Sequence, residues 1–244
     1  MSNPFILPDW PAPAGVHARV TTRAGGASVG PWQGLNLGSH VGDDPAHVAL
    51  NRAWLRSHLP SDPLWLNQTH GVDCVVAETA LAGCSADASV SFSAGHVCAV
   101  LTADCLPVLF CSRDGKAVGA AHAGWRGLLA GVLENTVRQM HVPSADVLAW
   151  LGPAIGPQTF EVGSEVRAAF VAHDPAAASA FAPKGKDGDK WLADIYQLAR
   201  QRLQAAGITQ IYGGEFCTVS DPQRFYSYRR DGTTGRMASL IWRD

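Results

Sequence analysis

The sequence predicts a mixed fold of the α/β (or α+β) class, in which a sandwich of mixed β-sheets is flanked by helices. Short apolar runs with the length of buried strands recur along the chain, and longer segments between them carry helix start and stop signals. These strands and helices do not show the strict alternation of a doubly wound parallel sheet. The chain has 244 residues and no internal repeat. We therefore expect residues 1–244 to form a single domain.

The first half of the chain predicts mainly strands, with one helix. The strands are β-branched or apolar runs bounded by Gly, Pro and Asp. They are expected at residues 16–22, 64–66, 74–77, 97–101, 106–111 and 117–121. Asp114 and Gly115 predict a tight hairpin turn between the last two strands. A helix should begin at Pro45, with Asp44 as its N-cap, and end before Pro60. The prolines before residue 14 predict an extended lead-in, and residues 35–43 should be irregular.

The second half predicts more helix. Helices are expected at about residues 122–140, 164–173 and 192–206, the last ended by Gly207. Strands are expected at residues 147–151, 208–212 and 238–242. The segment 175–189 is rich in Ala, Lys, Asp and Gly, which predicts a mobile surface loop. Residues 221–236 predict a long polar loop that holds four arginines, most of which we expect to be solvated.

The composition excludes several classes of protein. With 47% hydrophobic residues and a net charge of -2, the chain is too apolar and too weakly charged to be disordered. The 19 basic and 21 acidic residues nearly cancel, so we expect neither nucleic acid nor a membrane as a partner. No apolar window is long enough for a transmembrane helix, and the N-terminus lacks signal-peptide features, which predicts a cytoplasmic protein. No apolar helix stripe stands out, which favours a monomer.

Three residues at the ends of predicted strands could carry chemistry: His70, Cys105 and His122. Two imidazoles and a thiolate suit Zn²⁺, and three protein ligands leave a fourth position open, as in catalytic zinc sites. Alternatively, Cys105 is a nucleophile whose thiol pKa is lowered by one of the histidines. Spacing does not separate these roles, because both require a thiolate. The other five cysteines form no C-x-x-C pair and are expected to be free thiols.

Two arginines are candidates for binding an anion. Arg23 lies in a Gly-rich loop, and Arg126 lies in the first turn of a predicted helix, where backbone N–H groups also attract negative charge. Arg126 could instead make only local contacts. Several catalytic signatures are absent from the sequence, namely the H-E-x-x-H helix of zinc proteases, the P-loop and the motif of cytidine-type deaminases. The chain also lacks the H-x-H pairs of multicopper oxidases.

Several motifs together resemble one known family. They are Asn-Gln-Thr-His-Gly at 67–71, Thr-Ala-Asp-Cys-Leu-Pro at 102–107, His-Ala-Gly-Trp-Arg-Gly at 122–127 and Gly-Pro-Ala-Ile-Gly at 152–156. Segments 21–26, 35–38 and 226–232 add to the match, which spans nearly the whole chain. The sequence is similar to the YfiH/laccase-domain family, also called the polyphenol oxidase or purine nucleoside phosphorylase family, which includes the peptidoglycan-editing factor PgeF.

The resemblance implies a single-domain sandwich of mixed sheets with a metal held by His70, Cys105 and His122. The metal is usually zinc, although the family name points to copper. The implied activity is phosphorolysis of adenosine, inosine, guanosine and methylthioadenosine, with adenosine deamination as a second reaction. Purine nucleoside and phosphate are then the expected substrates. The family's loop arginine corresponds to Arg23, and Asn36 is a candidate substrate contact or, alternatively, a turn-stabilising amide.

As a mechanistic hypothesis, Arg23 is our first candidate and Arg126 our second for holding phosphate. Asp104 either orients the neighbouring Cys105, acts as a general acid, or only stabilises its turn. Three alternatives to the phosphorylase remain. They are a Cys–His hydrolase acting on a peptidoglycan precursor, a copper-dependent polyphenol oxidase and a non-catalytic metal-binding partner protein.

Overall fold

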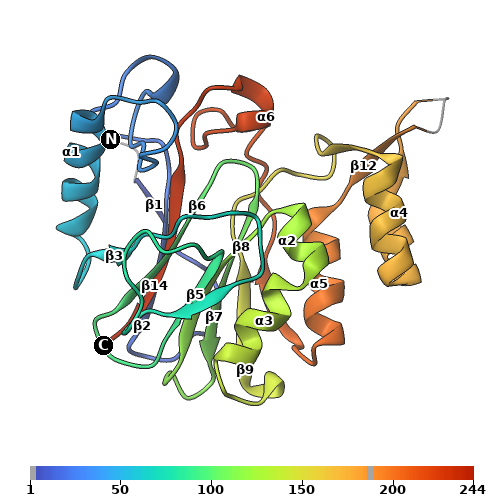
Figure 1. Cartoon of the computed structure of the whole chain (residues 1–244), viewed down its shortest axis with the longest axis horizontal. Helices are drawn as coiled ribbons and strands as arrows, with labels where there is room; N and C mark the ends of the chain where they lie inside the picture. The colour runs from blue at the N-terminus through green and yellow to red at the C-terminus, as the bar shows by residue number, and fades with distance from the viewer. Residues whose placement is uncertain (1–3, 186–188) are drawn as a thin grey trace.

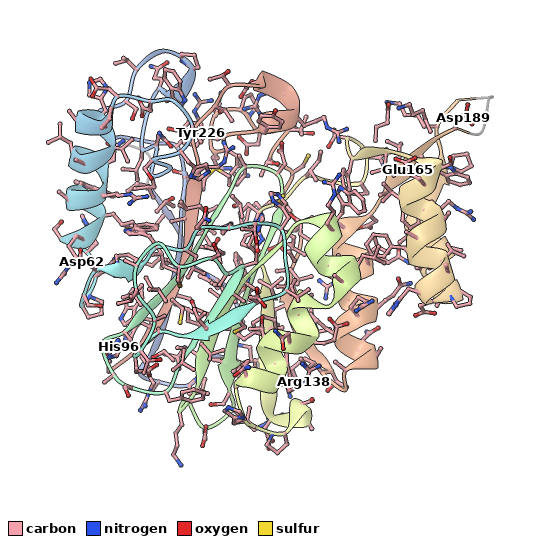
Figure 2. All side chains as sticks on the ribbon, viewed as in Figure 1. Asp62, His96, Arg138, Glu165, Asp189 and Tyr226 are labelled. Carbon is pink, nitrogen blue, oxygen red and sulfur yellow. The ribbon has the colours of Figure 1, made fainter. Side chains whose placement is uncertain are left out.

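Two β-sheets packed face to face form the centre of the structure, a computed structural model that describes residues 4–185 and 189–244. Helix α1 covers the outer face of one sheet, and α2, α3 and α5 cover the outer face of the other (Figure 1). Side chains fill the space between the layers (Figure 2). Each sheet contains both parallel and antiparallel pairs. This arrangement confirms the predicted sandwich of mixed sheets flanked by helices.

The first sheet has five strands, in the order β1-β2-β14-β6-β3. Their bounds are Phe5–Ile6, Val16–Thr21, Met237–Arg243, Val97–Thr102 and Pro63–Leu64. Strand β6 shows why its sequence is apolar at every position. Val97, Ala99 and Leu101 pack on the α1 side, whereas Cys98 and Val100 pack between the two sheets. Alternate residues of a strand point to opposite faces, and here both faces are buried.

The second sheet has six strands, in the order β13-β9-β7-β8-β5-β4. Their bounds are Gln210–Gly213, Val147–Leu151, Leu106–Ser112, Val118–Ala123, Ala88–Ser91 and Cys74–Val76. The turn at Asp114 and Gly115 joins β7 to β8 as an antiparallel hairpin, as predicted. Strands β3 and β4, which flank residues 67–71, belong to different sheets. That segment therefore crosses from one sheet to the other, which brings its side chains to the end of the sandwich.

The helices begin and end at recognisable signals. Helix α1 spans Pro45–Arg56, and Asp44 caps it by accepting a hydrogen bond of 2.8 Å from the N–H of Ala46. The single helix expected at 122–140 is wrong: α2 spans Trp125–Ala130 and α3 spans Val132–Gln139. Gly131, with a φ of 104°, separates the two helices. Residues before Gly124 belong instead to β8, which buries them against the sheet core.

A small third sheet and helix α4 (Ser164–His173) lie at the edge of the molecule beside α5 (Figure 1). Its strands β10, β12 and β11 span Glu161–Gly163, Lys190–Ala193 and Phe181–Pro183. The loop expected at 175–189 is therefore wrong over 175–183, which form a 3-10 helix and β11. Helix α5 spans Ile195–Ala205 and begins three residues later than expected, because β12 occupies the preceding residues and Asp194 provides the cap.

Several short elements lie where the sequence predicted none. Strand β1 occupies part of the lead-in, and α6 (Tyr228–Asp231) lies within the expected polar loop. Short 3-10 helices span Gly30–Trp32 and Ser144–Asp146. Residues 1–3 of the lead-in and 186–188 of the expected loop lie outside the described residues. In the described part of the chain, no helix combines the length and apolarity needed to cross a membrane.

The Gly131 junction gives a test of the helix break. Replacing Gly131 with Ala places a Cβ on a left-handed backbone, so we expect the free energy of unfolding to fall by about 1 kcal/mol. Urea unfolding measures this loss. The Gly131→Asn variant should lose less, because Asn tolerates this backbone region better than Ala. Equal stability of Gly131→Ala and the parent chain would contradict the assigned break.

Candidate metal centre

Three separate segments bring His70, Cys105 and His122 together at one end of the sandwich. Their ligand atoms all lie within 4.8 Å of one another, and we call these three residues the His–Cys–His cluster. Cys105 directly precedes β7 and His122 lies near the end of β8, and the antiparallel pairing of these strands places them close together. His70 arrives on the segment that crosses between the sheets. Its Nε2 lies 3.8 Å from Cys105 Sγ, and its ring lies edge-on to that of His122.

Asp87 holds this arrangement in place. Its carboxylate is fully buried and accepts a hydrogen bond of 2.7 Å from His122 Nδ1. It also accepts hydrogen bonds from the backbone N–H groups of Thr69, His70 and Gly71 at 2.7–3.0 Å. One carboxylate therefore fixes the tautomer of His122, with Nε2 left for the cluster, and the backbone that carries His70. The backbone of His70 has a φ of 61°, a conformation that residues other than Gly rarely adopt.

Hydrogen bonds and charges in the site shift three pKa values. Burial alone would raise the pKa of Asp87, but the hydrogen bonds from His122 and Gly71 lower it well below its usual range. Burial also opposes ionisation of Cys105, yet the charge and hydrogen bond of His122, aided by His70, lower its thiol pKa to about 6. Burial would lower the pKa of His122, but Cys105 and Asp87 raise it to about 9. Without a metal, the cluster therefore pairs a thiolate with a protonated His122 at neutral pH, and binding of a metal would displace the proton from His122.

Two glycines of the segment 122–127 are required by close approach. A Cβ at Gly124 would lie 2.8 Å from Cδ2 of His70 and 3.2 Å from Sγ of Cys105. A Cβ at Gly127 would lie 2.7 Å from the carbonyl oxygen of Gly71. The start of α2 thus packs directly on the cluster and on the segment that carries His70. This packing explains the glycine spacing of the motif.

Gln68 attaches the same segment to the other sheet. Its side-chain Nε2 donates to the carbonyl oxygen of Leu101 at 2.8 Å, and its Oε1 accepts from the N–H of Leu101 at 2.7 Å. The side-chain amide of Gln68 thus makes two hydrogen bonds to the backbone of β6, as a residue of a neighbouring strand would. Asp87, which directly precedes β5 of the second sheet, and Leu101 in the first sheet hold the segment from its two sides.

Two cavities meet at the cluster and share His70, Ala103, Cys105 and Tyr228. The first cavity has a volume of about 390 Å³. Its other lining residues are His40, Gln68, Leu101, Thr102, His122 and Arg236. The second cavity has a volume of about 280 Å³. Its other lining residues are Asp104, Trp125, Arg126, Ile155, Phe160, Ile195 and Arg229. A bound molecule in either cavity would lie against the cluster.

Asp104 and Arg126, both singled out in the sequence, border the second cavity. The carboxylate of Asp104 is buried and accepts hydrogen bonds of 2.6 Å from Oγ1 of Thr218 and from the N–H of Arg229. It therefore ties the turn before Cys105 to the C-terminal segment. The guanidinium of Arg126 lies over the ring of Trp125, 4.4 Å from its centroid, and remains exposed.

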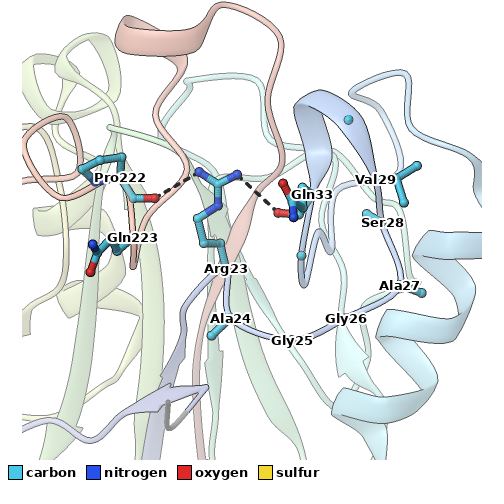
Figure 3. Close-up of a pocket in the computed structure, with 12 residues that line it drawn as sticks. Arg23, Ala24, Gly25, Gly26, Ala27, Ser28, Val29, Gln33, Pro222 and Gln223 are labelled. Atoms are coloured by element: carbon cyan, nitrogen blue, oxygen red, sulfur yellow. Dashed lines mark hydrogen bonds between the residues drawn. The ribbon is translucent and has the colours of Figure 1, made fainter. Parts of the chain in front are cut away.

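Arg23 and Asn36 do not reach these two cavities. Arg23 lines a separate, open cavity of about 910 Å³ that shares no lining residue with the other two (Figure 3). Its guanidinium donates to the carbonyl oxygens of Pro222 and Gln33 and lies over the ring of Tyr226. Asn36 is fully buried, and its amide bonds Gly38, Asp43 and the N–H of Arg236. This geometry supports the turn-stabilising interpretation of Asn36.

The expectation that the arginines of 221–236 are mostly solvated holds for the exposed Arg224 and Arg229 but is wrong for Arg230 and Arg236, which are half-buried. Arg230 donates to the carbonyl oxygens of Thr218, Val219 and Phe225. Arg236 is half-buried and lines the first cavity. Neither Arg236 nor Asp87 was singled out from the sequence as a residue of this site. Its position immediately before strand β14 was the available signal, because a residue at a strand end has a fixed place.

Asp87 is tested through metal affinity. The Asp87→Asn variant keeps the size of the side chain but loses the charge and one acceptor, so His122 and the His70 backbone are held less firmly. We expect the affinity for zinc to fall by about 10- to 100-fold. Competition against a chelating dye measures this. Asp114→Asn, which removes a carboxylate from the remote β7–β8 turn, is the matched control and should leave the affinity unchanged.

Gly124 provides a second test of the geometry. In Gly124→Ala, the added methyl group displaces His70 and Cys105, so zinc affinity should fall by about tenfold while the fold is kept. Gly71→Ala should change the affinity less, because its Cβ would lie 3.3 Å from Oγ1 of Thr69 and 3.5 Å from Oδ2 of Asp87 and would displace no ligand atom directly. Equal effects of the two variants would contradict the close approach assigned to Gly124.

Comparison with known proteins places the chain in a family. A family model described as multi-copper polyphenol oxidoreductase laccase matches residues 17–244. The Escherichia coli protein named purine nucleoside phosphorylase YfiH is 58% identical over 241 residues, 98% of each chain. A Pseudomonas aeruginosa protein named purine nucleoside phosphorylase is 57% identical over 240 residues, again 98% of each chain.

Solved structures agree with this family assignment. A Neisseria meningitidis protein described by the family name DUF152 is 53% identical with a TM-score of 0.95, over 99% of this chain and 100% of that one. A Bacillus licheniformis hypothetical protein YfiH is 32% identical with a TM-score of 0.87, over 99% and 100%. The chain therefore belongs to the YfiH family of laccase-domain proteins, whose family model is described as a multi-copper polyphenol oxidoreductase laccase.

Proposed function

We propose that this protein is a zinc-dependent purine nucleoside phosphorylase that also deaminates adenosine. Its substrates would be adenosine, inosine, guanosine and methylthioadenosine, each with phosphate. The observation that carries the proposal is the His–Cys–His cluster at the junction of two cavities. Relatives at 57% and 58% identity that carry the name purine nucleoside phosphorylase support the substrate class.

The donor set fits zinc. A thiolate and two imidazoles form a borderline-soft site, and three ligands leave one position open. A bound zinc ion would supply a Lewis acid and lower the pKa of a bound water. The roles of the chain's own residues follow from their contacts. Asp87 orients His122, and Asp104 positions the turn before Cys105, since both oxygens of its carboxylate already accept hydrogen bonds.

The two arginines that the sequence offered as phosphate ligands differ in how well they can reach a substrate at the cluster. Arg126 borders the second cavity and keeps an exposed guanidinium, so it remains a candidate for contact with substrate. Arg23 donates to two backbone carbonyls and lines a different cavity, so a direct contact with a substrate at the cluster requires that loop to rearrange.

A second candidate function is a Cys–His hydrolase acting on a peptidoglycan precursor. It is favoured by the line of groups Asp87, His122 and Cys105, which has the order of an Asp–His–Cys triad, and by the thiol pKa of about 6. A multi-copper oxidase is less well supported. The chain has 9 histidines and no H-x-H pair, and the described residues contain one group of three metal-ligand side chains. Copper in place of zinc at that single group remains an alternative.

Cys105→Ala separates these functions. For a metal-dependent phosphorylase, the variant should lose bound zinc and at least 99% of both phosphorolysis and deamination, because the thiolate is one of three ligands. Metal analysis of the purified protein and an assay of adenosine with phosphate for adenine, hypoxanthine and ribose 1-phosphate measure these losses. Cys84→Ala, at a half-buried thiol in a turn outside both cavities, is the matched control and should retain metal and activity.

Two outcomes would overturn the proposal. Retained zinc with full turnover in Cys105→Ala would remove Cys105 from the metal site. A metal-free parent enzyme that stays active and is inactivated by thiol alkylation would instead support the hydrolase.

A further inference from the structure

Arg236 faces the His–Cys–His cluster across the first cavity with unused hydrogen-bond donors. One guanidinium nitrogen, Nη1, donates to the carbonyl oxygens of Thr234 and Gly235 at 3.1 and 3.0 Å. Within the described part of the chain, its Nε and Nη2 have no hydrogen-bond partner. The side chain is half-buried and lines the first cavity. A fixed cation with free donors in a cavity suits an oxyanion.

The segment 35–43 supports this side chain. A Cβ at Gly38 would lie 2.8 Å from Cγ of Arg236, so the segment is packed directly on the arginine stem. Asn36 accepts a hydrogen bond of 2.9 Å from the backbone N–H of Arg236, and its own amide is held by Asp43. His40, from the same segment, lines the same cavity. The arginine is therefore positioned from both its backbone and its stem.

The second cavity has a different character. Trp125 and Phe160 line it together with the aliphatic Ile155 and Ile195. The guanidinium groups of Arg126 and Arg229 lie over the two aromatic rings. Planar heterocycles are bound by such walls, with few polar groups needed to orient them. The arginines of the second cavity are stacked on its aromatic rings, which favours a planar base there, and the two cavities meet at Cys105 and His70.

We propose that the first cavity is the phosphate subsite, with Arg236 as its principal ligand, and that the second cavity takes the purine base. This assignment rests on the proposed phosphorylase function. In the reaction, an oxygen of hydrogen phosphate forms a bond to C1′ of the ribose while the bond from C1′ to N9 breaks. The electron pair of the broken bond stays on N9, and the proton of hydrogen phosphate passes to the purine. The products are ribose 1-phosphate and the free base.

The test begins with binding of inorganic phosphate alone to the zinc-loaded protein, measured by calorimetry. Arg236→Gln should lower the phosphate affinity about tenfold or more, and Arg236→Lys should lower it less, because the charge remains without the fork. Arg138→Gln is the matched control, since Arg138 lies on α3 at the opposite end of the molecule from Tyr226 (Figure 2). It should bind phosphate as the parent chain does.

Kinetics then separate the two subsites. Arg236→Gln should raise the KM for phosphate and leave the KM for nucleoside and the rate of adenosine deamination, which needs no phosphate, nearly unchanged. Trp125→Leu should do the reverse, with an increased KM for nucleoside and unchanged phosphate binding. Gly38→Ala, which displaces the arginine without removing it, should reproduce the effect of Arg236→Gln in weaker form. A thermal melt of each variant verifies folding, and Gly38→Ala and Arg236→Lys carry the test if Arg236→Gln does not fold.

Unchanged phosphate affinity in Arg236→Gln, or a loss of nucleoside affinity in its place, overturns the subsite assignment. Failure of the proposed function looks different. If the parent protein binds phosphate through Arg236 but forms no ribose 1-phosphate, the phosphorylase proposal fails while the anion site stands.

Discussion

The buried carboxylate of Asp87 is the group on which the geometry of the candidate metal centre depends. It bonds the ring of His122 and three consecutive backbone N–H groups around His70, so it joins two segments that are 52 residues apart in the sequence. Burying a carboxylate is unfavourable unless its oxygens are well bonded, and here five donors reach it. The depressed pKa of Asp87 reflects that bonding. Without it, His70 would have little reason to keep a left-handed backbone.

The double sheet explains why the site can be held so firmly. Strands β7 and β8 are buried on both faces, so the residues at their ends are fixed by a large apolar core. The crossing segment is bonded to β6 by Gln68 and to β5 by Asp87, which makes the two sheets act as one support. Glycines at 124 and 127 then let α2 close over it. Rigid scaffolding of this kind is what a site with demanding geometry needs.

The sequence alone is enough to predict the three residues of the His–Cys–His cluster. His70, Cys105 and His122 each lie in a distinctive turn beside a strand, so local pattern was enough to single them out. Asp87 was missed because Ser-Ala-Asp-Ala-Ser around it has no local signature, and its role arises only from contacts with remote segments. The short strands β5 and β10 to β12 escaped for a related reason: they lack a long apolar run, and tertiary pairing forms them. Arg236 was placed among solvated residues because charge alone does not reveal burial.

The remaining ambiguity between metal ligand and nucleophile has a physical cause. Any site that lowers the thiol pKa of Cys105 by placing an imidazole beside it prepares the thiolate for both roles. The third donor is the feature that differs. A Cys–His–Asp triad would need only His122 and Asp87, whereas the imidazole of His70 also lies at the cluster, on a backbone that Asp87 holds with three hydrogen bonds. A three-donor metal site requires His70, whereas a Cys–His–Asp triad can be formed without it. The geometry therefore favours the metal centre, and the two cavities beside the cluster leave room for substrates.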